Sequence, residues 1–141
     1  MRTIILKSPS VALGAAAALA LLLAACGSTV STGDYRGPSK AVAQRISDFQ
    51  SDVVAGEEKK LCNRDLASSV QTRLRAGGGD CVQALKKQLG AIDDYEISIA
   101  SIAVHGTSAT ARVKSTWSGK QRASTMQFVK EGNSWRIATL Q

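Results

Sequence analysis

The apolar residues of this chain follow three different patterns along its length. Between residues 11 and 25 they form a run without one charged residue. From residue 38 to residue 90 they recur at every third or fourth position, which is typical of amphipathic helices, and from residue 95 onward they alternate with polar residues, which is typical of half-buried strands. The chain is therefore predicted to hold an apolar N-terminal segment, a helical region and a strand region, in that order.

Four helical segments are predicted in the helical region. The first has one apolar face, formed by Val42, Ile46, Phe49 and Val53. Proline, capping carboxylates and glycines mark the boundaries of all four segments. The predicted starts fall at Pro38, Glu57, Asp65 and Asp80, and the predicted ends at Gly56, Cys62, Gly77 and Gly90.

Four strands are predicted after Gly90, at about 95–104, 108–117, 121–130 and 134–140. Tight glycine-containing turns separate them, so neighbouring strands are expected to pair antiparallel. Because the helices precede the strands without alternation, the predicted fold class is α+β, with N-terminal helices packed on one face of a curved four-stranded antiparallel sheet.

Length and composition narrow the class of protein. The chain has 141 residues, of which 44% are hydrophobic and 21% are charged. These values are close to the globular average, and they exclude collagen-like, fully disordered and multi-span membrane proteins. Six aromatic residues and one histidine leave few side chains for elaborate chemistry.

The apolar run 11–25 follows Arg2 and Lys7 and is shorter than the roughly 20 residues of a membrane span, as in a signal peptide. It ends in Leu-Ala-Ala-Cys-Gly at 23–27, which resembles the lipobox of bacterial lipoproteins. The resemblance implies that residues 1–25 are removed and that Cys26 becomes a lipidated first residue. The alternatives are an ordinary signal peptide cut after an Ala-x-Ala site, or a short uncleaved anchor with Cys26 as a free thiol.

The lipobox resemblance implies an address and a domain layout. Two or three acyl chains hold a protein on a bilayer far more firmly than one chain does. The protein is expected to be exported and anchored to the outer face of the bacterial cell membrane. Residues 26–38 are rich in Gly, Ser and Thr and are expected to form a flexible tether, which leaves residues 39–141 as a single domain.

Three cysteines are present, and if Cys26 is acylated only Cys62 and Cys81 are left to pair. A cysteine pair in a small exported domain is more often a disulfide than two thiols. Free buried thiols, a redox pair or a metal site are the alternatives, but zinc needs further ligands and His105 is the only histidine. We expect a structural disulfide, no metal and no cofactor.

The strand region carries a second resemblance. An alternating strand at 109–113 and Gly119-Lys120 are followed by an apolar strand, a Lys-Glu-Gly turn and Trp-x-Ile over residues 126–137. This succession resembles the closing hairpins of the nuclear transport factor 2-like superfamily. With the helices and the cysteine pair, residues 39–141 look like small actinobacterial lipoproteins of that superfamily. The resemblance implies a cone-like, cystatin-like topology, in which several members bind or transform small apolar molecules inside the cone.

Alternation along the strands points several large side chains toward the expected cone. Trp135 and Ile137 fall on one side of the last strand, and Trp117 ends the inward row of an earlier strand. Large aromatics in small domains usually belong to the core, and a pocket beneath them is the alternative. The candidate pocket residues are Phe49, Val113, Trp117, Phe128, Trp135 and Ile137.

A catalytic constellation is not evident. Enzymes of the resembling superfamily place Asp, His or Tyr in the cone, but His105 stands in a predicted exposed turn. Asp93, Asp94, Tyr95 and Glu96 form either a solvated connection or an acid site, and the first is favoured. Neither Gly-x-Ser-x-Gly, nor a phosphate loop, nor a metal-ligand spacing occurs in the sequence. We therefore expect a protein that is not an enzyme.

Charge is unevenly spread along the sequence. Residues 26–100 hold ten basic and ten acidic residues, whereas residues 101–141 hold six basic residues and one acidic residue. These residues either serve only solubility and protect strand edges, which is slightly favoured, or form a basic face for anionic lipid or cell-wall polymer. Nucleic acid is not an expected partner in this compartment. The candidate face consists of Arg112, Lys114, Lys120 and Arg122.

These observations favour a membrane-anchored, non-catalytic domain that binds a small apolar ligand or an envelope partner. A structural scaffold with a basic face is the alternative. An isomerase, dehydratase or hydrolase in the cone is the least favoured class.

Overall fold

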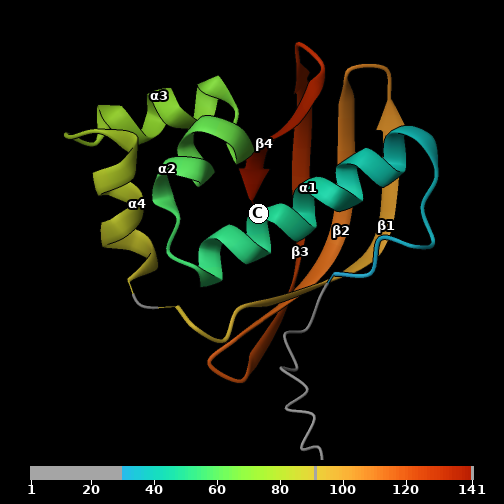
Figure 1. Ribbon diagram of the computed structural model, residues 1–141, viewed down its shortest axis with the longest axis horizontal. Coiled ribbons are helices and arrows are strands. Elements are labelled where there is room, and N and C mark those ends of the chain that lie inside the picture. The colour runs from blue at the N-terminus through green and yellow to red at the C-terminus, as the bar shows by residue number, and fades with distance from the viewer. Residues whose placement is uncertain (1–29, 91, 141) are drawn as a thin grey trace, which may run out of the picture.

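The computed structural model describes residues 30–90 and 92–140 of the chain. Figure 1 shows the helices gathered on one side of a single sheet, with α1 lying across the strands. The α+β prediction is thereby confirmed. The elements in chain order are α1 (Gly37–Val54), α2 (Glu58–Lys60), the π-helix η1 (Leu61–Asp65), α3 (Ser68–Ala76), α4 (Cys81–Leu89), β1 (Glu96–His105), β2 (Ser108–Trp117), β3 (Lys120–Glu131) and β4 (Ser134–Leu140).

The sheet is an antiparallel meander in the order β1-β2-β3-β4, as the turn spacing predicts. Register shifts interrupt the pairing at Ile99/Ser101 and at Gln127/Phe128. An extra residue in one strand bends that strand and increases its twist. These irregularities accompany the curvature that lets the sheet wrap around the helices (Figure 1).

Helix α1 supplies the apolar face that the sequence spacing predicts. Pro38 lies in its first turn, and Val42, Ile46, Phe49 and Val53 are all buried against the sheet side of the molecule. Gly56 follows with a φ of +64°, a conformation that suits glycine best, and ends this segment as predicted.

The second predicted helical turn is longer than expected, because α2 continues into the π-helix η1. Its Cys62 forms the predicted disulfide with Cys81 at the start of α4. The bridge joins two residues that are 19 positions apart in the sequence. It closes a loop that contains α3 and the three consecutive glycines. The disulfide therefore ties α4 covalently to η1.

Two capping predictions have different outcomes. Asp80 caps α4 as expected, because its carboxylate accepts a hydrogen bond of 2.8 Å from the backbone N–H of Gln83. The prediction that Asp65 caps α3 is wrong, since Asp65 is fully buried at the end of η1. Glu131, at the end of β3, instead accepts hydrogen bonds from the backbone N–H and the hydroxyl of Ser68 in the first turn of α3.

The core lies between the helices and the side of the sheet that faces them, which we call the inner face. The largest fully buried apolar side chains come from α1, η1, β3 and β4. They are Phe128, Ile46, Leu61, Met126, Ile137 and Val42.

The predicted signal peptide and Cys26 lie outside the described residues. Of the predicted tether, residues 30–38 are described, and Val30 is part of the core with 6% of its surface exposed. Val30 therefore packs with the domain, and α1 begins at Gly37. Among the helices of residues 30–90 and 92–140, none is long and apolar enough to cross a membrane.

Candidate functional site

Burial changes along the inner face of the sheet. On β2 the inward residues Ala109, Ala111 and Val113 are buried, Ser115 is half-buried, and Trp117 at the strand end is 52% exposed. The inner-face partners on β3 change in step, from Phe128 and Met126, which are buried, to Arg122 and Lys120, which are exposed. The helices thus cover one end of the inner face and leave the other end open.

A hollow of about 860 Å³ lies at this uncovered end. We call it the open-end hollow. Its volume is within the range of small-molecule sites, about 300–1,000 Å³. The residues that line it are Tyr95, Ser115, Trp117, Ser118, Lys120, Gln121 and Arg122.

The tight turn between β2 and β3 forms one rim of the hollow. Ser118 and Gly119 have φ values of +48° and +70°, and positive φ at both central positions is what a two-residue type I′ hairpin requires. This turn places Trp117 directly opposite Lys120 in the strand register, and Ser115 opposite Arg122. The first pair therefore places an aromatic ring beside a cation, and the second pair places a hydroxyl beside a cation, all on the same face.

Tyr95 closes the other side of the hollow, just before β1. Its ring packs edge-on against Phe49 of α1, with centroids 6.3 Å apart and planes at 83°. Burial raises the pKa of Tyr95, because it disfavours the phenolate. The phenol is therefore neutral at physiological pH and able to donate a hydrogen bond.

The two cations of the hollow are Lys120 and Arg122. Among the ion pairs of the described residues, none includes Lys120 or Arg122. The lining formed by the described residues also contains no carboxylate. An exposed indole, a neutral phenol, hydroxyls and two uncompensated cations thus surround one space, an arrangement suited to holding a flat molecule with an acceptor or anionic group.

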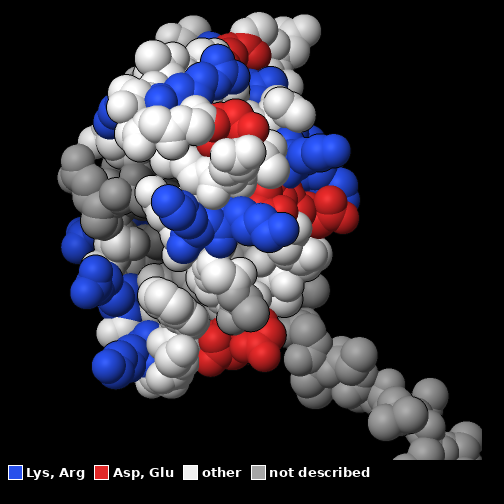
Figure 2. Space-filling view, turned by 90° about the vertical axis from the view of Figure 1, so that its left-hand side faces the viewer, with Lys and Arg blue, Asp and Glu red and all other residues white. Residues whose placement is uncertain are grey.

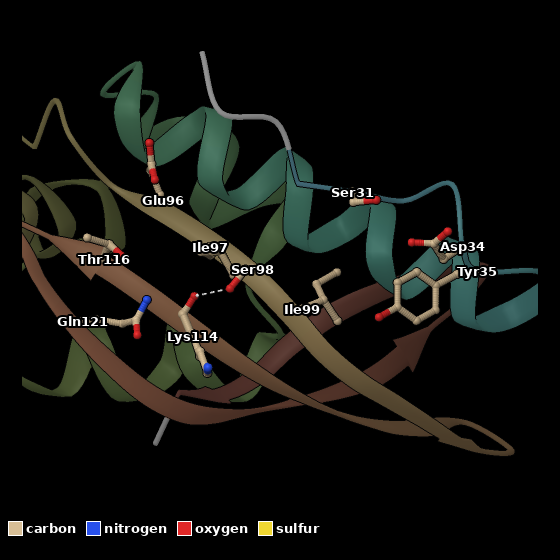
Figure 3. A pocket seen from close by; sticks show the side chains of 10 residues that line it. All are labelled: Ser31, Asp34, Tyr35, Glu96, Ile97, Ser98, Ile99, Lys114, Thr116 and Gln121. Carbon is tan, nitrogen blue, oxygen red and sulfur yellow. Dashed lines mark hydrogen bonds between the residues drawn. The ribbon is translucent and has the colours of Figure 1, made fainter. Parts of the chain in front are cut away.

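A second hollow, of about 340 Å³, lies between the segment 31–35 and the β1–β2 pair. Figure 3 shows its lining, which includes Asp34, Glu96 and Lys114. In this view Glu96 and Lys114 point to opposite sides, and Asp34 lies at the far end beside Tyr35. Its charged groups do not converge on one point, so it is the weaker candidate for a binding site.

Buried charges lie elsewhere, between α1 and η1. Arg45 donates one hydrogen bond of 2.5 Å to the Asp65 carboxylate and another of 2.9 Å to the backbone carbonyl of Trp135. Arg64 donates to Asp52, a second buried carboxylate, at 2.6 Å. These contacts join α1, η1 and β4, and they hold the carboxylates in ion pairs inside the domain rather than in either hollow.

The pKa of Asp65 is raised from 3.8 to about 6. Burial is the largest cause, the neighbouring Asp52 carboxyl adds to it, and the hydrogen bond from Arg45 opposes it. Its Oδ2 atom accepts no hydrogen bond within the described part of the chain. A proton on the Asp65 carboxyl supplies a donor toward Asp52.

Sequence reasoning missed this ion-pair group. Asp52 stands next to the apolar Val53 on the buried side of α1, and the interruption of an apolar face by a carboxylate is the available signal. Asp65 gave no such signal, because an aspartate before a helix is ordinarily a cap.

The six candidate pocket residues divide into two groups. Phe49, Val113, Phe128, Trp135 and Ile137 are buried in the core, with at most 6% of their surface exposed. Trp117 alone of the six lines the open-end hollow. The expectation that Trp117 points inward is met by the strand register, but helices do not cover it.

The structure does not bring the four candidate anion-binding residues together on one face. Arg112 and Lys114 alternate with the buried residues of β2 and lie on the outer face of the sheet. Lys120 and Arg122 pair with Trp117 and Ser115 and lie on the inner face. The alternation of a strand separates the two pairs.

Further basic side chains lie on the helices, within residues 26–100, where the sequence holds equal numbers of basic and acidic residues. Figure 2 shows the side of the molecule that carries α3 and α4, with Lys and Arg spread over it from top to bottom and Asp and Glu lying between them. Arg73 and Arg75 lie in the last turn of α3, and Lys86 and Lys87 in the last turn of α4. The acids that balance this region in the sequence include Asp52 and Asp65, which are buried.

The candidate acid–base residues do not converge. His105 is exposed at the end of β1, opposite Ser108, whereas the open-end hollow lies where β2 ends at Trp117. Asp93, Asp94 and Glu96 are exposed and do not line the open-end hollow. Groups of metal-ligating residues do not occur within residues 30–90 and 92–140.

Two solved structures have the same arrangement of helices and sheet. One is an NTF2-like protein of unknown function from Silicibacter pomeroyi DSS-3, at 16% identity and a TM-score of 0.52, over 71% of this chain and 89% of that chain. The other is an NTF2-like protein of unknown function from Shewanella baltica OS155, also at 16% identity and 0.52, over 72% and 89%. The chain has an NTF2-like fold. At this identity the likeness concerns the fold alone.

A family model described as "Putative lumazine-binding" matches residues 81–140, which span α4 and the whole sheet. This match includes Tyr95 and the β2–β3 residues that line the open-end hollow of the NTF2-like domain. No protein among those of curated function matches the sequence.

Proposed function

We propose that this protein is an exported, lipid-anchored NTF2-like protein whose domain binds a small ligand in the open-end hollow without transforming it. The hollow itself is the observation that carries the proposal. The exposed tryptophan stands beside two cations that form no ion pair within the described residues, in a space of about 860 Å³. The family model that matches this part of the chain is described by the binding of lumazine, a small heteroaromatic molecule.

The non-catalytic part of the proposal rests on the separation of acids from the hollow. General acid–base catalysis is most often carried out by a histidine or a carboxylate within hydrogen-bond reach of the reacting atoms. The buried acids Asp52 and Asp65 are held by Arg64 and Arg45, and the hollow is lined by neutral and cationic groups. Binding is therefore the function that this lining supports best.

Native mass spectrometry tests ligand binding directly. The full chain is released from its own membranes with a mild detergent and compared with the Trp117→Ala variant. We expect a co-purifying small molecule on the wild-type chain and its loss from the variant. Trp135→Phe is the matched control, because Trp135 lies in the core with 5% of its surface exposed. An adduct that persists in Trp117→Ala would contradict this site.

The anchor is tested on the intact protein mass. If Cys26 is the lipidated first residue, the membrane-bound product begins at Cys26 and carries acyl chains, and Cys26→Ala moves the protein to the soluble fraction. A membrane-bound protein that retains residues 1–25, or an unmodified Cys26, would overturn this part of the proposal.

A second candidate function, attraction to an anionic lipid surface or wall polymer, is supported by the basic side of α3 and α4 (Figure 2). Its test uses the Cys26→Ala chain, which has no acyl anchor, and anionic vesicles at low salt. Changing Arg75, Lys86 and Lys87 to Ala is expected to weaken cosedimentation. Equal sedimentation of both proteins would exclude this function.

A further inference from the structure

We propose that the open-end hollow selects ligands that combine a flat conjugated ring system with a carboxylate, Arg122 and Lys120 binding the carboxylate and Trp117 the ring. This inference rests on the proposed function and names the ligand class for the same site. It follows from which side chains the β2–β3 register places next to one another.

The ring-binding surface comes from two elements. Trp117 ends β2 with 52% of its surface exposed, and Tyr95 enters the hollow from the connection before β1. Tyr95 is fixed by its edge contact with Phe49, so it offers a preformed wall rather than a mobile side chain. Aromatic side chains bind flat ligands by stacking or edge contact, with little loss of conformational entropy.

The anion-binding surface lies directly beside this ring surface. Lys120 is the cross-strand partner of Trp117, and Arg122 is the cross-strand partner of Ser115. Side chains opposite one another on one face stand about 5 Å apart at Cβ. Both cations therefore lie close enough to Trp117 for a two-ring ligand stacked on its indole to reach them.

The charge of the lining favours an anion over a neutral or cationic ligand. No carboxylate lines the hollow, and within the described residues Arg122 and Lys120 have no ion-pair partner. Arginine presents a planar fork of donors that matches a carboxylate, and the hydroxyl of Ser115 stands on the same rung. The neutral phenol of Tyr95 adds no negative charge to oppose it.

Two probes with the same ring system test the selection. 2-Naphthoate carries a carboxylate, and 2-naphthamide replaces it with a neutral amide. Each is titrated calorimetrically into the full chain in nonionic detergent, with protein-free micelles as the blank. We expect the carboxylate to bind roughly tenfold tighter than the amide, as the loss of a charge-assisted hydrogen bond predicts.

Variants on the two faces of the β2–β3 pair provide matched controls. Arg122→Gln should abolish the preference for naphthoate, and Arg112→Gln should preserve it, because Arg112 lies on the outer face. Lys120→Gln and Lys114→Gln form a second pair with the same logic. If Arg112→Gln lowers the affinity as much as Arg122→Gln, the attraction is general and the inference is overturned.

The outcomes separate this inference from the proposed function. Equal binding of both probes, lost in Trp117→Ala, supports a binding site at the hollow and overturns selection by charge. Failure of both probes to bind overturns the inference, and the co-purification experiment above then decides on the proposed function by itself.

Discussion

The two ends of the inner face differ although they belong to the same strands. At the covered end, Ala109, Ala111 and Val113 meet the helices and are buried. At the open end the same alternation continues into Ser115 and Trp117, but the helical layer has ended. The strand pattern therefore specifies which side chains share a face, and the extent of the helices decides whether that face becomes core or site.

The covered end is also where the covalent and ionic constraints lie. The Cys62–Cys81 disulfide joins η1 to α4, and Arg45 joins α1 to η1 and β4. By contrast, the open end has a tight turn and two cations that form no ion pair among the described residues. Changes at the covered end should therefore affect stability, and changes at the open end should affect binding.

Removing core volume is expected to have the largest effect. Phe128 is 2% exposed at the covered end, and Phe128→Ala should cost about 3–5 kcal/mol in the free energy of unfolding, because it leaves a cavity. Urea unfolding followed by circular dichroism measures this cost. The control is Gln127→Ala on the same strand, whose side chain is exposed. A cost below about 1 kcal/mol for Phe128→Ala would show that the covered end is not tightly packed.

Loss of the disulfide should have the next largest effect. The double change Cys62→Ala and Cys81→Ala opens a loop with a sequence separation of 19. Chain entropy predicts a loss of about 3 kcal/mol, seen as a lower urea midpoint. Because the bridge lies among the helices, naphthoate binding by the folded variant should not change. A variant that keeps its stability but loses binding would reverse the division between the two ends.

The pH dependence of stability should reveal the buried acids. The pKa of Asp65 is about 6 in the folded protein against an ordinary value of 3.8, so the folded state holds its proton more tightly. The favourable contribution is present below about pH 4 and is lost as pH rises through about 6. Its size is on the order of 3 kcal/mol.

Comparison with Asp65→Asn isolates this contribution from those of other acids. The amide keeps an acceptor for Arg45 and a donor toward Asp52, so the variant should gain stability relative to wild type between pH 4 and pH 6.5. Urea unfolding at half-unit pH intervals gives the difference between the two curves. A flat difference would show that Asp65 titrates alike in both states.

Truncating the exposed tryptophan should have the smallest effect on stability. Trp117→Ala removes a side chain that is 52% exposed, and the free energy of unfolding should change by no more than about 0.5–1 kcal/mol. Naphthoate binding should nevertheless be lost. If the change instead destabilises the protein as much as Phe128→Ala, Trp117 belongs to the packing of the domain and not to a site.

Most of the fold could be predicted from local signals. Alternation and glycine turns placed the strands within one residue of their bounds, since 95–104 became Glu96–His105 and 121–130 became Lys120–Glu131. The cap of α3 could not be predicted, because it comes from Glu131, 63 positions from Ser68. Long-range partners of this kind have no signature near the residue that they serve.

The candidate site could be predicted only in part, for the same reason. The alternation of inward and outward residues correctly placed Trp117 on the inner face. The sequence does not show how far the helices extend over that face, so the exposure of Trp117 could not be predicted. Counting charge along the chain joined Arg112 and Lys114 to Lys120 and Arg122, although the hairpin places the two pairs on opposite faces. The signal peptide, the lipid on Cys26 and the membrane address stay predictions, as these positions lie outside the described residues.

The two tryptophans allow the most direct test of the open-end hollow. In the full chain, labelled with ¹⁵N and held in detergent micelles, each indole gives one N–H resonance, and Trp117→Phe assigns them. On titration with 2-naphthoate we predict that the Trp117 resonance shifts with saturation, while that of Trp135, 5% exposed in the core, stays in place. A shift of Trp135 alone, or no saturable shift of Trp117, would contradict the account.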